Sequence, residues 1–480
     1  MIPITRLLLC CSLIALVGAR AGRADPPPSA PSPSAPSPSP STPWGEDLVV
    51  MLVTFGPGDD VTSWFGHSAL VVEDRRTHDA RLYNYGEFSF DDTMLVRYAL
   101  GRLEFWVGER PVEPSLEIYR RQRRSIQVQE LALPPSQRLE LALFLRNNAL
   151  PENRGYLYDH FTDNCATRPR DVIDLVTAGR LRAVAGDDGG ASPAAGRMTL
   201  REHTRRHTAR SPALSTLFDF VMNSDVDRPL LRFEESFLPA ELAGLVADAS
   251  DVDGAPLVVR AWSDHEAPDR SPVPERAPRL EPWLLAIGVV AGVVGVGLAR
   301  SARSSRRRSA ARADRLLAWW TAGLGLFLGG PGLALAVMWT STDHLVAHDN
   351  ENVLLANPLT LLAFPLGVAW ALGSTRARRA QRWLWSALAV FALVGLALKA
   401  LPGFDQNNWN ILALVVPMVV GTATALSRAR APLPATAPAI TALEVAPPAD
   451  VVVVDAGVAA PQDPPVSAVP AGPAANSPPA

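Results

Sequence analysis

The chain is poor in cysteine. It has 3 cysteines in 480 residues, and Cys10 and Cys11 both lie in the hydrophobic part of an N-terminal export signal. Cys165 is therefore the one thiol expected in the mature protein, which excludes an internal disulfide. A single thiol in an exported protein is a buried small hydrophobe, an intermolecular link or a nucleophile.

A strong charge of one sign is also lacking. The formal net charge is −3, so nucleic acid is not indicated as a partner. The histidines have no partners at the spacing of metal ligands, so neither a metal site nor a cofactor is predicted.

The N-terminus is typical of a secretory signal. Arg6 precedes the apolar run Leu7–Ala19, and small residues follow up to residue 24. A retained signal anchor is the alternative, whereas the residues before Cys10 and Cys11 do not fit a lipoprotein signal. Residues 25–43 are almost entirely Pro, Ser and Ala, which predicts an extended linker.

Residues 44–264 have the pattern of a soluble mixed α/β domain. Strands are predicted at Asp47–Thr54, Gly66–Glu73, Arg81–Gly86, Leu103–Val107 and Ile126–Leu131. Polar residues join the second of these to the third, which predicts a hairpin. Helices are predicted from an N-cap at Ser136 through Asn148 and from Cys165 onward. A loop at 183–196 and helical pieces at 227–239 follow, and residues 265–282 form a Pro-rich connector.

The next part of the chain has the hydropathy of a membrane domain, residues 283–428. Five apolar runs are long enough to span a bilayer: 283–299, 316–339, 354–372, 383–401 and 411–426. The loops alternate between Arg-rich segments and segments without Lys or Arg, which puts the basic loops in the cytoplasm and the first domain outside. The Pro/Ala-rich tail 429–480 is predicted to be disordered.

The neighbours of Cys165 favour the nucleophile. Polar, turn-forming residues precede it, and an apolar-periodic segment follows it, as in a loop that enters a helix. The unpaired N–H groups and the helix dipole at such a position favour thiolate. We therefore expect Cys165 to be a reactive thiol.

A cysteine nucleophile needs a base, and His67 is the best candidate. It begins a predicted strand, where a general base is held more rigidly than in a loop. If the hairpin turn is tight, the residue opposite His67 falls between Asn84 and Glu87. Either side chain is then placed to accept the imidazole N–H, and the register that decides between them is not readable from the sequence.

These residues resemble a known group. A strand that begins Gly-His, followed about 100 residues later by Asp-Asn-Cys at a helix start, is similar to the circularly permuted branch of the papain-like NlpC superfamily, which includes the lecithin:retinol acyltransferase relatives. The closer resemblance is to the Lnb family of bacterial lipoprotein N-acyltransferases. In the first domain it is carried by Gly66–Leu70, Tyr83–Gly86, Asn153-Arg154 with Tyr158-Asp159, Asp163–Arg168 and Phe237–Pro239. In the membrane half it is carried by Thr342–His344, Asn350–Asn352, Asn357–Leu359 and Gln406-Asn407.

The resemblance implies a fold and a reaction. The fold is α+β: a circularly permuted papain-like extracytoplasmic domain, followed by an all-α membrane domain in the inner membrane. Cys165 then accepts an acyl chain from a phospholipid as a thioester and passes it to the N-terminal amine of a lipoprotein, with His67 as base. For this reaction, the residues themselves offer Asn84 as the candidate that orients His67, with Glu87 as the alternative. The backbone N–H of Cys165 and the Asn164 side chain are the candidates that hold the oxyanion.

Polar residues in the outward loops and one Arg beside Cys165 are candidates for substrate binding. They are Arg168, His344, Asn350, Asn352, Asn357 and Gln406. The loop residues bind headgroups or the lipoprotein amine, dock the soluble domain, or are simply polar as short loops are. A run of arginines in the first domain has two interpretations: it contacts anionic headgroups, or it is a solvated face. Its members are Arg120, Arg121, Arg123 and Arg124.

Two other functions use the same residues. A cell-wall amidase or peptidase anchored in the membrane would attack an amide with Cys165 and His67. A non-catalytic sensor or docking protein would bury its single cysteine. Five spans with polar outward loops favour the lipid substrate over the wall.

Overall fold

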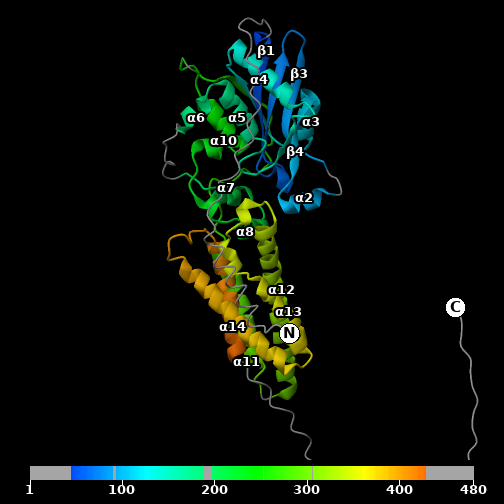
Figure 1. Ribbon diagram of the computed structural model, residues 1–480, viewed down its shortest axis with the longest axis vertical. Coiled ribbons are helices and arrows are strands. Elements are labelled where there is room, and N and C mark those ends of the chain that lie inside the picture. The colour runs from blue at the N-terminus through cyan, green and yellow to red at the C-terminus, as the bar shows by residue number, and fades with distance from the viewer. Residues whose placement is uncertain (1–44, 90–92, 188–196, 252, 305, 429–480) are drawn as a thin grey trace, which may run out of the picture. The chain divides into compact units, whose positions relative to one another are not determined.

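The computed structural model describes residues 45–89, 93–187, 197–251, 253–304 and 306–428 (Figure 1). The predicted signal, the linker and the C-terminal tail lie outside these residues. The described part consists of a mixed α/β domain with one sheet, followed by a helical region with five candidate membrane spans.

The sheet has seven strands in the order β6-β4-β3-β2-β1-β5-β7, and every neighbouring pair is antiparallel. The strands are β1 (Leu48–Phe55), β2 (His67–Asp74), β3 (Asp79–Glu87), β4 (Glu104–Pro111), β5 (Ile126–Leu131), β6 (Gly155–Leu157) and β7 (Val258–His265). All five predicted strands are present, and the predicted hairpin is β2–β3, closed at Asp74↔Asp79.

Helices cover both faces of this sheet because the central strands are apolar on both sides. Leu52 and Leu70 pack on one face against α4 (Pro135–Asn148), α5 (Thr167–Val176) and α10 (Pro239–Asp248). Val53 and Val71 pack on the other against Leu116 of α3 (Val112–Arg121). Figure 1 shows α5 and α10 on one side of the strands and α3 on the other.

The remaining helices of this domain are short. They are α2 (Met94–Leu100), α6 (Arg180–Ala185), α7 (Leu200–His207), α8 (Pro212–Val221) and α9 (Arg232–Glu235), with 3₁₀ turns η3 (Val61–Ser63) and η4 (Ser224–Asp227).

Four details differ from the sequence prediction. Ser136 is not a cap, because α4 begins at Pro135 and its N-cap is Pro134. The helix expected at Cys165 begins at Thr167. The helices α2, α3, α6, α7 and α8 and the edge strand β6 were not anticipated. The edge strand β7 was also missed, and it ends at His265, where the connector was predicted to begin.

The helical region has five segments that are long and apolar enough to cross a membrane, as the sequence predicts. They are α11 (Glu281–Ser301), α12 (Arg307–Ser341), the composite segment Glu351–Ala371, α14 (Thr375–Leu398) and α15 (Trp409–Arg428). The composite span contains the 3₁₀ turns η6 (Glu351–Leu354) and η7 (Pro358–Leu362) before α13 (Ala363–Ala371), and η5 (Leu345–Ala347) precedes it. Gly292 and Gly421 let α11 and α15 approach closely, because a β-carbon on Gly421 would overlap Gly292.

Candidate active site

Cys165 lies in a tight loop that leads into α5. The cysteine is free and partly exposed. The carboxylate Oδ1 of Asp159 accepts hydrogen bonds from the amides of Phe161 (2.9 Å) and Thr162 (2.8 Å), which turns the chain before the cysteine. After the cysteine, the loop is tied to the helix by Asn164. Local hydrogen bonding therefore fixes where the thiol lies.

Asn164 has a role different from the predicted oxyanion donor. Its amide nitrogen donates to the carbonyl oxygens of His160 (2.7 Å) and Phe237 (3.1 Å). Its Oδ1 accepts from the amides of Ala166 (2.7 Å) and Thr167 (3.0 Å), the first free N–H groups of α5. Because both amide hydrogens are engaged with main-chain oxygens, this side chain braces the Cys165 loop and caps its helix.

His67 contacts one of its two predicted partners. His67 Nε2 lies 2.5 Å from Asn84 Oδ1, so the ring donates to the amide oxygen. The other candidate, Glu87, is occupied elsewhere: its carboxylate accepts from Arg110 and from the indole N–H of Trp106. With Nε2 donating, His67 Nδ1 is left as the ring nitrogen that can accept a proton.

Gly86 is the point where Cys165 and His67 come together. The β3–β4 ladder shifts register between Tyr85 and Glu87, and Gly86 at this bulge has φ 115°, a conformation that favours glycine. A β-carbon on Gly86 would lie 3.7 Å from His67 Cε1 and 3.9 Å from Cys165 Cβ. The sheet end thus brings together two residues that lie about 100 positions apart in the chain.

The Ser68 amide also faces the cysteine. The β2–β3 ladder ends at Leu70↔Tyr83, so Ser68 lies beyond the last pair on that side of β2. The backbone N–H groups of Ser68 and of Cys165 itself both lower the pKa of the Cys165 thiol. Two amides therefore lie close to the sulfur, where an oxyanion would form.

Burial decides the resting protonation of this pair. It raises the pKa of the Cys165 thiol to about 11, although the Ser68 amide, the Arg124 charge and the Cys165 amide all lower it. Burial also lowers the pKa of the His67 imidazole to about 4, the Asn84 hydrogen bond raising it and the Arg124 charge lowering it further. The expected thiolate is thus replaced by a neutral thiol beside a neutral imidazole, because the desolvation cost exceeds the effect of the helix terminus.

Aromatic rings and one buried arginine complete the surroundings. The sequence reasoning missed the rings and named Arg124 only as one member of a charge run. The Tyr119 ring of α3 stacks on Phe55 (3.6 Å between centroids) and on His67 (6.0 Å). The Arg124 guanidinium lies 4.9 Å from the centre of the Tyr119 ring. A charge run was visible in the sequence, but nothing in it marked Arg124 as the buried member.

Arg168 is engaged within its own loop. It forms an ion pair with Asp163, with 2.7 Å between Arg168 Nη2 and Asp163 Oδ2, and lies 4.3 Å over the Tyr156 ring. This pair links the residues on both sides of Cys165 and holds the entry of α5.

The polar residues predicted for substrate binding in the membrane half mostly dock the soluble domain instead. Asn350 donates to the Val221 carbonyl (2.7 Å), Asn352 to the Phe220 carbonyl (2.9 Å) and Gln406 to the Met222 carbonyl (2.9 Å). These carbonyls lie at the C-terminal end of α8 and are otherwise without helical partners. Of the alternatives left open by the sequence, docking is the one the contacts support.

Of the two further candidates from the membrane half, His344 also contacts the soluble domain, and Asn357 has a local role. His344 Nε2 contacts the Tyr98 carbonyl of α2 at 2.8 Å, beside the ion pair of Asp343 with Arg102. Asn357 caps η7, because its Oδ1 accepts from the Leu359 amide at 3.0 Å. That local hydrogen bond is the partner that an asparagine at the end of a span requires.

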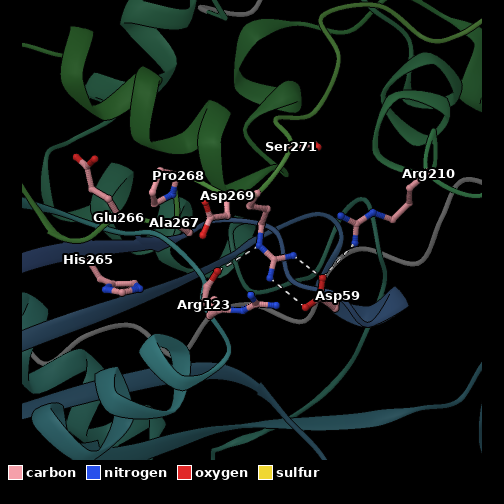
Figure 2. A pocket seen from close by; sticks show the side chains of 10 residues that line it. Asp59, Arg123, Arg210, His265, Glu266, Ala267, Pro268, Asp269 and Ser271 are labelled. Atoms are coloured by element: carbon pink, nitrogen blue, oxygen red, sulfur yellow. Dashed lines mark hydrogen bonds and ion pairs between the residues drawn. The ribbon is translucent and has the colours of Figure 1, made fainter.

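A polar pocket of about 420 Å³ lies apart from Cys165 (Figure 2). Its lining is balanced in charge, with Arg123, Arg210 and Arg270 against Asp59, Glu266 and Asp269. Arg270 holds Asp59 at 2.7 and 3.1 Å, and these pairs are drawn as dashed lines in Figure 2. Among the described residues, no group of three or more His, Cys, Asp or Glu side chains is placed to hold a metal ion.

The fold and the predicted topology define a membrane protein with a periplasmic α/β domain, and comparison with protein families supports the same class. Residues 45–206 match the Lnb N-terminal periplasmic domain, and residues 308–430 match the Lnb transmembrane domain. The chain belongs to the Lnb family. Membership suggests an enzyme. Neither the curated proteins nor the solved structures contain a match to this chain.

Proposed function

We propose that this protein is a thiol-dependent acyltransferase of the inner membrane that moves an acyl chain from a phospholipid to the N-terminal amine of a lipoprotein. The observation that carries the proposal is the meeting of Cys165 and His67 at Gly86, with the imidazole bound to Asn84, in a chain with five apolar spans. A circularly permuted papain-like fold, with the catalytic domain at 44–264 and the membrane domain at 283–428, belongs to the same proposal.

The first half-reaction forms a thioester. His67 Nδ1 takes the proton of the Cys165 thiol as the sulfur attacks the ester carbonyl carbon of the lipid. The amides of Ser68 and Cys165 are positioned to donate to the resulting oxyanion. The carbon–oxygen bond of the ester then breaks, His67 returns its proton to the departing alkoxide, and a lysophospholipid leaves.

The second half-reaction forms an amide. The neutral N-terminal amine of a diacylglyceryl-cysteine lipoprotein attacks the thioester carbon, and His67 accepts a proton from its nitrogen. The carbon–sulfur bond breaks, and the sulfur regains the proton from His67. Asn84 keeps the ring in one tautomer and orientation through both steps, since its amide oxygen accepts from Nε2.

Both Cys165 and His67 are neutral at rest, which suits an apolar substrate that displaces water from the site. A thiol with a pKa near 11 is weakly reactive by itself, so its attack on the ester requires proton transfer to His67 in the same step. The aromatic surroundings, with Phe105 stacked on Tyr158 at 4.3 Å near Gly86, suit an acyl chain better than a polar peptide. This feature favours the acyltransferase over a wall amidase or peptidase.

Mass spectrometry of lipoprotein N-termini tests the proposal. Cells with the intact protein should carry N-acylated lipoproteins, and cells with Cys165→Ser or His67→Gln should accumulate the diacylated form with a free amine. Glu266→Gln, an exposed substitution in the polar pocket, is the matched control. Normal N-acylation in a Cys165→Ser strain that accumulates the protein would refute the proposal. A change in wall fragments with unaltered lipoproteins would instead support the amidase or peptidase.

A further inference from the structure

Arg124 is a buried cation without a carboxylate partner. Its exposed fraction is 5%, and its Nε donates to the Gly56 carbonyl at 2.7 Å. Its Nη2 is buried and, within the part of the chain that the structure describes, has no hydrogen-bond partner. No Asp or Glu of the described residues pairs with it. An unpaired buried charge is costly, so this arrangement is expected where a ligand supplies the missing anion.

Two neighbouring arginines of the same run, unlike Arg124, have carboxylate partners. Arg120 pairs with Asp264 at 2.8 Å, and Arg121 pairs with Glu117 at 2.9 Å. The arginines of the nearby polar pocket face an equal number of carboxylates (Figure 2). Arg124 is thus a cation near Cys165 whose charge the protein leaves unneutralised.

Ring contacts place Arg124 one side chain away from the base. Its guanidinium lies 4.9 Å from the Tyr119 ring centre, and Tyr119 stacks on His67 at 6.0 Å with an interplanar angle of 16°. Arg124 and Cys165 also influence each other electrostatically, since each lies close enough to shift the pKa of the other. A group bound to Arg124 would therefore lie beside the reacting ester rather than at a remote surface.

We propose that Arg124 binds the phosphodiester of the acyl donor and so selects a phospholipid as the substrate of Cys165. The inference rests on the proposed acyl transfer. In a glycerophospholipid only the glycerol backbone separates the ester carbonyl from the phosphate, so an anion site one aromatic ring from the base matches the substrate. Arginine is also the side chain best suited to phosphate, because its planar donors pair with two oxygens.

The test uses the purified full-length protein and two acyl donors with the same chains, phosphatidylethanolamine and diacylglycerol, which lacks the phosphate. Acyl-enzyme formed at Cys165 is quantified by peptide mass spectrometry. Arg124→Met should slow acylation from the phospholipid roughly 10- to 100-fold, the factor expected for a lost charge-assisted hydrogen bond. It should change acylation from diacylglycerol by less than about threefold. Arg124→Lys should be intermediate, and the exposed neighbour Arg123→Met should resemble the wild type.

The other possible outcomes distinguish a failure of the Arg124 assignment from a failure of the proposed acyl transfer. Equal losses with both donors would make Arg124 an oxyanion or structural residue and overturn its assignment to phosphate. Inhibition by inorganic phosphate in the wild type, without any preference between the two donors, would assign the site to free phosphate and overturn the lipid assignment. If no donor acylates the wild type, the proposed function itself fails.

A second measurement does not depend on acyl transfer. Iodoacetate and iodoacetamide alkylate the same thiol but differ in charge, so their rate ratio at Cys165 reports the local attraction for an anion. Arg124→Met should lower that ratio roughly 10-fold relative to Arg123→Met, the scale of one lost ionic contact. An unchanged ratio in a folded variant would overturn anion binding by Arg124.

Discussion

His67 Nε2 lies 2.5 Å from Asn84 Oδ1, although Ala69, not His67, would face Asn84 if the β2–β3 register continued past its last pair at Leu70↔Tyr83. The contact is therefore diagonal across the end of the hairpin. It leaves Nδ1 as the imidazole nitrogen that can accept a proton, and it is short enough to restrain the ring plane.

Removing this contact should impair catalysis more than stability. Asn84→Ala frees the imidazole to rotate and to change tautomer, so we expect acyl-enzyme formation at Cys165 to slow about 10- to 100-fold. Single-turnover acylation followed by mass spectrometry measures the effect. Glu87→Gln is the control and should stay within about threefold of the wild type, because Glu87 is bound by Arg110 and Trp106 instead. A larger loss in Glu87→Gln than in Asn84→Ala would reverse the assignment.

The reactivity of Cys165 should rise steeply with pH. Its thiol has a pKa raised to about 11 and becomes nucleophilic only as it loses its proton. Alkylation by iodoacetamide should therefore increase about tenfold per pH unit between pH 7 and pH 10. Unfolded protein serves as the control, since its thiol titrates near an ordinary value and its rate should level off by about pH 9. A rate independent of pH between 6 and 9 would indicate a thiolate–imidazolium pair and contradict the expectation.

Gly86 should not tolerate a side chain. Gly86→Ala adds a β-carbon between Cys165 and His67 at a φ of 115°, which alanine rarely adopts. We expect a destabilisation of about 1–3 kcal/mol and a loss of acyl transfer that exceeds the loss of folded protein. Thermal unfolding and lipoprotein N-acylation measured together separate the two effects. Gly155→Ala is the matched control in β6, where no atom lies within 4 Å of the added carbon.

Asn164 should behave as a brace rather than as a catalytic donor. Asn164→Ala removes two acceptor contacts at the start of α5 and two donor contacts to main-chain oxygens, so the midpoint of thermal unfolding should fall with the activity. The cap alone is worth about 1 kcal/mol. Asn164→Asp keeps the acceptor and should recover part of the stability. Lost turnover with an unchanged midpoint would restore the oxyanion role.

Asn350, Asn352 and Gln406, which dock the soluble domain, should affect stability rather than catalysis when they are mutated. Asn352→Ala removes the shorter of two hydrogen bonds to the Phe220 carbonyl and takes the acceptor from the buried Asn408 amide, at a cost of about 1–3 kcal/mol. We expect lower accumulation and a lower unfolding midpoint, with little change in the lipid concentration that gives half-maximal rate. Asp405→Asn, an exposed substitution in the loop that carries Gln406, should match the wild type in all three. A selective effect on lipid affinity would instead favour substrate binding.

Local patterns were sufficient to single out Cys165 and His67, the two residues that the structure places beside Gly86. Cys165 and His67 are visible because a strand start and a helix start are marked by short-range signals, and the hairpin narrows the third residue to Asn84 or Glu87. The register beyond Leu70↔Tyr83 depends on the bulge at Gly86, which no local pattern specifies. The protonation of the pair was mispredicted, since burial depends on the whole fold rather than on the helix terminus.

The roles that the sequence left open depend on contacts between distant parts of the chain. Arg124 has the same sequence context as its paired neighbours, and only the packing of α3 on β3 and β5 buries it beside Tyr119. Asn350 and Asn352 reach carbonyls about 130 positions earlier in the chain. For such loop residues the sequence shows polarity, whereas the identity of the partner comes from tertiary structure.

The neutral Cys165 thiol has a consequence for the redox chemistry of the protein. Peroxide and disulfides react with the thiolate, and a thiol whose pKa is near 11 is almost entirely protonated at neutral pH. Among the described residues Cys165 is the only cysteine, so this part of the chain offers no resolving thiol. A raised thiol pKa that slows oxidation would therefore protect Cys165 in an oxidising periplasm, where the described residues offer it no disulfide partner.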